Sequence, residues 1–316
     1  MKIKTLFILS NLFWCLFSCD SNLDNVVLIS ELPIDNLELQ QHIIGQLSGH
    51  KSLENNMVIN ARWSKLERHL TRDYLKQLIS VLDIEPIVHD YVSPNINPAV
   101  DLVFEPFRGS NVYGILPATT KTNDYIILGA HYDTGVRGAP GAVDNASGMT
   151  LIFTVIKQMK SLKSRNKNIV IVFFDQEEEE NVGSKAFTKL IDDNTWNVHS
   201  VHCFDMAGWD GDDNDEFEVY SPSDALIELY RSSSEHYGIP LDEVIIDPIG
   251  YDKGSTDFDE FVKTGYNSIG GGECVYKGDY SPYKDTVKDT FETVDFEYLW
   301  SNTKLVSKVI NNLISD

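Results

Sequence analysis

The chain has 316 residues, of which 42% are hydrophobic, and its formal net charge is −22. Such a charge repels the phosphates of nucleic acids and anionic lipid headgroups, so we expect neither as a direct partner. The length and apolar content suffice for a globular protein with a large core. No linker, low-complexity stretch or repeat is found after about residue 38, which predicts one domain over residues 38–316.

The first residues have the pattern of an export signal. Two lysines precede an apolar run over residues 6–17, and a serine stands before Cys19. Such a segment is removed on export, and Cys19 resembles the lipid-bearing first residue of bacterial lipoproteins. We predict a signal peptide over residues 1–18, a tether over 19–37, and a cell-envelope protein that meets the membrane only through a lipid at Cys19. Simple secretion and a short buried helix are the alternatives.

Export and lipidation would leave two cysteines in an oxidising compartment, Cys203 and Cys274. They can pair with each other or act as small buried hydrophobic residues. The sequence leaves both possibilities open, because a disulfide depends on geometry.

The rest of the chain alternates short β-rich runs with segments of helical periodicity. Helices are expected at 39–53, 63–82, 147–162, 183–191, 224–237, 257–264 and 294–313. Strands are expected at 100–104, 111–116, 125–130, 168–174, 201–204 and 266–269. This alternation predicts an α/β fold whose sheet is covered on both faces. In such folds the active site lies beyond the carboxyl ends of the strands.

The strand at 125–130 leads into His131 and Asp133. A neutral imidazole can bind a metal while a nearby carboxylate fixes its tautomer. For this pair alone, a hydrogen-bonded structural histidine is the alternative. A glycine-rich loop then presents Asp144 just before the next helix. The alternative role of Asp144 is to cap that helix.

Two further strands end in carboxylates. Four consecutive glutamates, residues 177–180, follow the apolar strand at 168–174, and Asp205 follows the strand at 201–204. A glutamate run usually faces water. If it is buried it needs a partner, and a divalent cation is a natural one. One glutamate would then bind the metal while its neighbour acts as a general base.

In this order the four clusters resemble the bacterial leucyl aminopeptidase family of two-zinc exopeptidases, which also contains glutaminyl cyclases. The resemblance runs from about Asn111 to Leu299. It implies a three-layer α/β/α zinc-exopeptidase fold with a central mixed, mostly parallel sheet. It also implies an aminopeptidase that hydrolyses peptides with a free amino terminus.

The resemblance also assigns roles to individual residues. Two zinc ions would be bound. One would be held by His131 and Asp205, the other partly by Glu178, and Asp144 would bridge both. Glu177 would be the general base on a water that bridges the ions, and Asp133 the carboxylate that orients His131. Glu179 and Glu180 receive no role.

One position departs from the family pattern. The segment 280–290 resembles the family's His-Thr-x-x-Asp-Thr segment, but Asp285 stands where the histidine belongs. The second ion would then be held by oxygen ligands alone, from Asp144, Glu178 and Asp285. Such a site tolerates manganese, magnesium or calcium as well as zinc, and the alternative is that it stays empty. We expect an active aminopeptidase, with a peptide-binding protein that does not cleave, and a glutaminyl cyclase, as alternatives.

Overall fold

The computed structural model describes residue 29 and residues 31–93, 107–248 and 256–315. The expected signal peptide, Cys19 and the strand expected at 100–104 lie outside these residues, so they stay predictions. Among the described helices, none combines the length and apolar character needed to cross a membrane.

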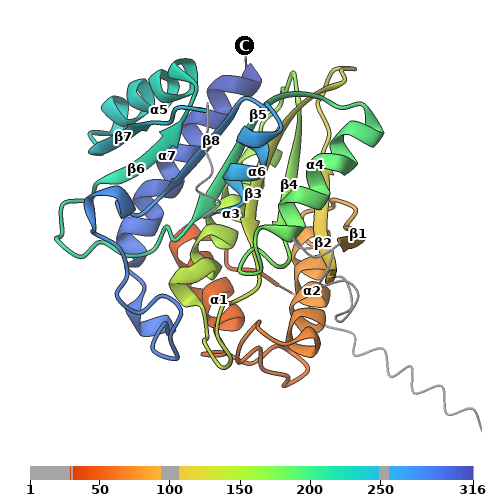
Figure 1. Cartoon of the computed structure of the whole chain (residues 1–316), viewed down its shortest axis with the longest axis vertical. Coiled ribbons are helices and arrows are strands. Elements are labelled where there is room, and N and C mark those ends of the chain that lie inside the picture. Colours follow the sequence, from red (N-terminus) through yellow and green to blue (C-terminus); the bar gives the residue numbers. More distant parts are fainter. Residues whose placement is uncertain (1–28, 30, 94–106, 249–255, 316) are drawn as a thin grey trace, which may run out of the picture.

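A mixed sheet of eight strands occupies the centre of the protein (Figure 1). Its order is β1 (Ile87–Ser93), β2 (Phe107–Leu116), β4 (Asn168–Phe174), β3 (Asp124–His131), β5 (Asn197–Asp205), β8 (Ser268–Gly272), β6 (Phe217–Ser221) and β7 (Leu241–Ile245). Strands β4, β3, β5 and β8 are parallel, as are β6 and β7. The pairs β1–β2, β2–β4 and β6–β8 are antiparallel. The predicted mixed, mostly parallel sheet is confirmed.

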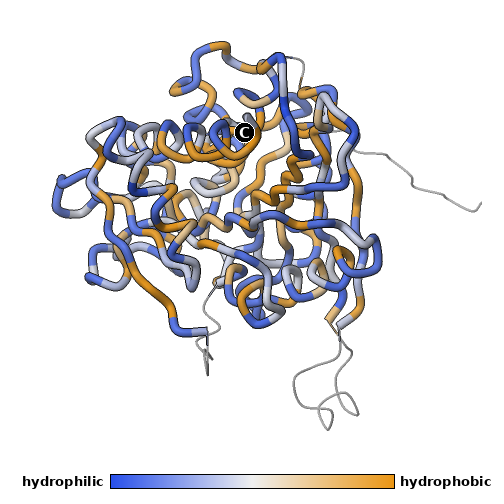
Figure 2. The backbone as a smooth tube through the Cα atoms, turned by 90° about the horizontal axis from the view of Figure 1, so that it is seen from above, coloured by the Kyte–Doolittle hydropathy of each residue, from blue (hydrophilic) through white to orange (hydrophobic). Residues whose placement is uncertain are grey.

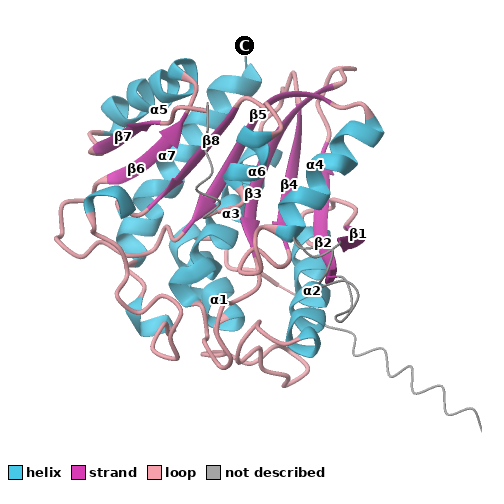
Figure 3. Cartoon of the chain, viewed as in Figure 1, coloured by secondary structure: helices cyan, strands magenta, loops and turns pink. Residues whose placement is uncertain are grey.

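Helices cover both faces of the sheet (Figure 3). They are α1 (Asn36–Leu47), α2 (Lys65–Ser80), α3 (Gly148–Lys160), α4 (Val182–Asn194), α5 (Asp224–Tyr237), α6 (Phe258–Lys263) and α7 (Phe296–Ser315). Helices α1, α2, α3, α5 and α7 share one hydrophobic core, and α4 and α6 belong to a second. Short helical turns lie at Ala142–Ser147, Val275–Lys277 and Phe291–Thr293.

The side chains of the central strands point alternately to the two faces of the sheet, and this produces the two cores. Ile126 and Leu128 of β3 lie in the first core, whereas Ile127 lies in the second. Successive strand side chains point to opposite faces, so a strand buried on both faces is apolar throughout. In Figure 2 the hydrophobic segments gather accordingly in the interior. The long apolar runs of the sequence therefore became the parallel centre of the sheet.

Three strands were not predicted from the sequence. Strands β1, β6 and β7 are short, lie near the edges of the sheet and carry acidic residues such as Asp90, Glu218 and Glu243. Acidic residues have low strand propensity, and neighbouring strands supply the pairing that stabilises them here. The open question about the cysteines is resolved, because Cys203 and Cys274 are both free and buried.

A buried histidine in β5 makes stability depend on pH. His202 contacts Tyr230 Oη at 3.0 Å and Ser200 Oγ at 2.9 Å. Burial lowers the pKa of His202 to about 3. In the unfolded chain the imidazole keeps a pKa of about 6.5. As pH falls from 6.5, only the unfolded state gains this proton, so the free energy of unfolding decreases.

We therefore expect this group to remove roughly 2 kcal/mol of the free energy of unfolding between pH 7 and pH 5. His202→Gln abolishes that part of the loss, as measured by urea unfolding at the two pH values. His236→Gln, a change at an exposed histidine of α5, is the control and leaves the difference unchanged. An identical pH dependence in wild type and His202→Gln contradicts the prediction.

Candidate metal and catalytic site

The candidate site forms where neighbouring parallel strands end. His131 is the last residue of β3, Asp205 is the last residue of β5, and Glu177 and Glu178 closely follow β4. Because these strands are parallel neighbours, their carboxyl ends share one edge of the sheet. Ligand atoms of His131, Asp144 and Glu178 lie within 4.8 Å of one another, as do those of His131, Glu177 and Asp205.

The ring of His131 is enclosed by carboxylates. Its Nε2 atom lies 3.2 Å from an oxygen of Asp144 and 3.2 Å from an oxygen of Asp205. Two ligands of one tetrahedral zinc ion are about 3.3 Å apart when the bonds are roughly 2.0 Å long. The spacing on each side of the imidazole nitrogen therefore suits a shared metal ion.

Asp133 connects the histidine to the glutamates. Its carboxylate accepts hydrogen bonds from the backbone N–H of Glu177 at 3.0 Å and of Glu178 at 3.3 Å. One of its oxygens also lies 3.6 Å from His131 Nδ1. A single side chain thus fixes the turn after β4 relative to the end of β3.

The loop that carries Asp144 is fixed in the same way. Asp289 accepts hydrogen bonds from the backbone N–H of Val143 at 2.8 Å and of Asp144 at 2.9 Å. The next side chain, Asn145, donates to the carbonyl of Phe204 at 2.9 Å, beside the end of β5. The Asp144 loop is therefore tied both to the segment after β8 and to the strand that ends in Asp205.

Arg62 lies behind this loop and is fully buried. Within the described residues its guanidinium donates hydrogen bonds to backbone carbonyls only, at Leu47, Tyr132, Pro140, Gly141 and Asp144. The five acceptors come from the end of α1, from the residue after His131, and from the loop that leads into and includes Asp144. Arg62 thus holds three backbone segments together with one rigid group.

Asp285 lies at the open side of the site and is exposed. A Cβ atom on Gly135 would collide with Oδ1 of Asp285 and with Oε2 of Glu178, so both carboxylates face the same glycine. Asp285 belongs to neither group of ligand atoms within 4.8 Å. The structure therefore brings Asp285 beside Glu178 but leaves it at the edge of the cluster.

Burial and mutual repulsion dominate the electrostatics of the site. Burial raises the pKa of Glu177 well above its ordinary value, and burial with the charge of Asp144 raises the pKa of Glu178 to about 8. Burial would lower the pKa of His131, but the charges of Glu177 and Asp205 raise it well above its ordinary value. Crowded carboxylates around one imidazole are the donor set that a divalent cation stabilises. The residues present therefore fit one or two metal ions.

Several residues of this arrangement were not assigned from the sequence. Three of them form hydrogen bonds with backbone groups, and no sequence motif predicts such contacts. They are Arg62, Asn145 and Asp289. Asp257 also received no role, yet it is 2% exposed and its charge contributes to the raised pKa of Glu177. The aspartate of the His-Thr-x-x-Asp-Thr pattern was the one available signal for Asp289.

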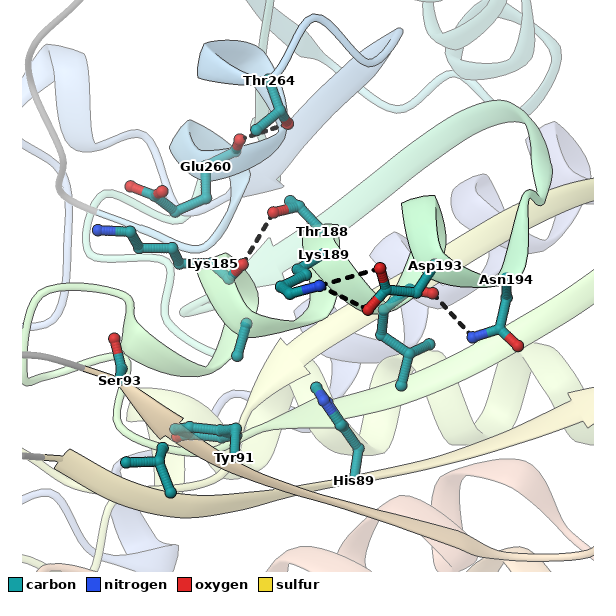
Figure 4. Close-up of a pocket in the computed structure, with 13 residues that line it drawn as sticks. His89, Tyr91, Ser93, Lys185, Thr188, Lys189, Asp193, Asn194, Glu260 and Thr264 are labelled. Atoms are coloured by element: carbon teal, nitrogen blue, oxygen red, sulfur yellow. Dashed lines mark hydrogen bonds and ion pairs between the residues drawn. The ribbon is translucent and has the colours of Figure 1, made fainter.

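A cavity of about 730 Å³ lies away from these residues, between β1, α4 and α6. Its walls include His89, Tyr91, Lys185 and Glu260, and an ion pair joins Lys189 to Asp193 (Figure 4). None of the candidate metal ligands lines it. Its size alone therefore does not make it the site of the chemistry.

A sheet of this topology, with imidazole and carboxylate groups at the ends of its parallel strands, defines a three-layer α/β/α zinc-exopeptidase fold. The chain belongs to peptidase family M28, whose family model matches residues 111–310. The family relationship expected from the sequence is confirmed.

Solved structures share this fold, and curated proteins match part of the sequence. The zinc aminopeptidase BSAP from Bacillus subtilis has a TM-score of 0.74 at 15% identity, covering 90% of this chain and 96% of that one. A glutaminyl cyclase from Bacteroides thetaiotaomicron has a TM-score of 0.68 at 15% identity, covering 89% and 99%. Leucine aminopeptidase 2 from Trichophyton rubrum is 30% identical over 177 residues, or 51% of this chain. The match spans only 33% of that relative's length.

The contacts of Arg62 predict a specific loss of metal affinity. We expect Arg62→Met to lower zinc affinity by about 10- to 100-fold, because the loop that carries Asp144 loses its support. The free energy of unfolding should fall by more than about 2 kcal/mol, since five carbonyls lose a buried donor. Zinc titration calorimetry and urea unfolding measure the two effects.

Arg165→Met is the matched control. Arg165 is also buried and donates to the carbonyls of Pro117, Met159, Lys160 and Leu162, none of which belongs to the site. It should lose comparable stability and keep its zinc affinity. Unchanged zinc affinity in Arg62→Met would refute the positioning role.

The exposed position of Asp285 predicts two unequal metal sites. We expect Asp285→Ala to keep the first equivalent of zinc and to bind the second about tenfold more weakly. Asp285→His should bind the second equivalent more tightly, because imidazole suits zinc better than a further carboxylate. Metal analysis after equilibrium dialysis measures both, with Asp193→Ala on α4 as control. Loss of both equivalents in Asp285→Ala, or of neither, contradicts this assignment.

Proposed function

We propose that the protein is a metal-dependent aminopeptidase that hydrolyses amino-terminal residues from peptides. The observation that carries this proposal is the convergence of His131, Glu177 and Asp205, and of His131, Asp144 and Glu178, within 4.8 Å at the ends of parallel strands. Membership of a peptidase family supports hydrolysis of peptide bonds. Aminopeptidases among the relatives support action at the amino end.

The proposed metal ligands follow from the spacing of donor atoms. His131, Asp144 and Asp205 would hold one zinc ion, since imidazole and carboxylate together suit zinc. A second ion would be held by Asp144, Glu178 and Asp285. When bound, these ions supply Lewis acidity, which polarises the scissile carbonyl and makes water a better nucleophile.

Glu177 is the proposed general base. Its ligand atom lies within 4.8 Å of donor atoms of His131 and Asp205, and Asp133 fixes its backbone. A carboxylate there can take a proton from the attacking water at one of its oxygens. After the C–N bond breaks, the same carboxyl group can return the proton to the leaving amine.

The open side of the site suits a free amino terminus. Glu178 and Asp285, two of the proposed ligands of the second ion, face the same glycine there. The amine of a terminal residue, which an internal peptide segment lacks, would bind at this side together with the ion that these carboxylates would hold. This arrangement supports cleavage from the end of a chain.

The proposal predicts a specific effect of one glutamate. Purified protein supplied with zinc, manganese or cobalt should release amino-terminal residues from peptides. We expect Glu177→Gln to lower kcat at least about 100-fold, because the general base is lost. Glu180→Gln, in the same run but exposed, should retain activity. Equal activity of Glu177→Gln and wild type would refute the role of Glu177.

A second candidate function is peptide binding without cleavage. The exposed position of Asp285, outside both groups of close ligand atoms, favours it. Binding of peptides with no release of residues under any of the three metals would support this function over hydrolysis. Release of ammonia from a glutaminyl peptide, without hydrolysis, would instead indicate cyclisation.

A further inference from the structure

A small cavity adjoins the candidate metal site. Asp205, one of the proposed ligands, forms part of its wall together with Met206, Tyr220, Tyr276 and Lys284. Its volume is about 120 Å³, the space of roughly four water molecules. This is room for one short side chain beside Asp205.

Among the described residues that line this cavity, Lys284 is the only lysine or arginine. It is exposed, and in the described part of the chain its ammonium has no carboxylate oxygen within 4.0 Å. The nearby acids Asp144 and Asp205 attract it from farther away. Metal ions bound by these acids would offset their charge and leave the ammonium available to a ligand.

Two glutamates also line the cavity, but both are buried and already bonded to backbone. Glu218 is 0% exposed and accepts from the N–H of Tyr276 at 2.9 Å, and Glu273 is 1% exposed and accepts from the N–H of Ser281 at 2.8 Å. Among the described residues, the other oxygen of each has no hydrogen-bond partner, and it is buried too. Burial raises the pKa of Glu218 to about 7 and that of Glu273 well above its ordinary value, which lessens the negative charge beside the cavity. Because the glutamate oxygens are buried, the exposed Lys284 is the group that can contact a charged ligand in the cavity.

We propose that this cavity receives the side chain of the amino-terminal residue and that Lys284 selects acidic residues, aspartate or glutamate, at that position. A carboxylate would accept a hydrogen bond from the Lys284 ammonium. A lysine or arginine side chain would be repelled by Lys284. An apolar side chain would displace water from the ammonium and offer no acceptor in its place. This inference rests on the proposed function and names its substrate class.

Four aminoacyl p-nitroanilides test the selection: glutamyl, glutaminyl, leucyl and lysyl. Glutamine matches glutamate in shape but lacks its charge. We expect kcat/KM for the glutamyl substrate to exceed that for the glutaminyl substrate about fivefold or more, as for a partly exposed ion pair. This ratio should fall to about one in Lys284→Met. Lys288→Met changes an exposed lysine of the same segment that does not line the cavity, and it should keep the wild-type ratio.

Binding provides a readout that needs no turnover. With zinc present, calorimetric titration of the full chain with L-glutamate and L-glutamine should show the same preference, and Lys284→Met should lose it. If none of the four anilides is cleaved, the proposed aminopeptidase function fails, and the titrations alone decide on the cavity. A wild-type ratio near one in both assays, a preference for the lysyl substrate, or an unchanged ratio in Lys284→Met would overturn the inference.

Discussion

Repulsion between buried carboxylates is the constraint on which the rest of this site depends. Four acids gather around one imidazole, that of His131, and they are Asp144, Glu177, Glu178 and Asp205. Their mutual charge would drive them apart. The protein holds them through backbone contacts made outside the cluster. Asp133 accepts from two backbone N–H groups after β4, and Asp289 accepts from two in the loop that carries Asp144. The fold thereby fixes the acids without pairing them to one another.

These backbone contacts explain why the inner acids of the cluster are fixed in place, whereas Asp285 at its edge is not. Arg62 links the loop before Asp144 to the end of β3, so the inner acids cannot move apart independently. Asp285 has no comparable support in the described residues and lies exposed beside Glu178. A ligand held only by its own loop can be replaced with less cost to the fold. This is a physical reason why the chain departs from the family pattern at Asp285 rather than at His131 or Asp144.

The site has two sides with different tasks. The side of Glu178 and Asp285 is open and would hold the second ion, which suits the amine of a terminal residue. The side beyond Asp205 contains the small cavity, where Lys284 contributes an exposed charge and the glutamates are buried. One substrate residue carries both an amino group and a side chain, and the two sides of the site would recognise them separately.

The sequence by itself determined the α/β class, the central strands β2, β3, β4, β5 and β8, and the candidate ligands at their ends. Apolar runs and the polar residues that follow them are local patterns, so periodicity and motifs suffice to find them. Only the tertiary structure decided the edge strands β1, β6 and β7, the contacts of Arg62 and Asp289, and the cavity beside Lys284. These features depend on hydrogen bonds and packing between segments far apart in the chain, and no local pattern encodes which segments will meet.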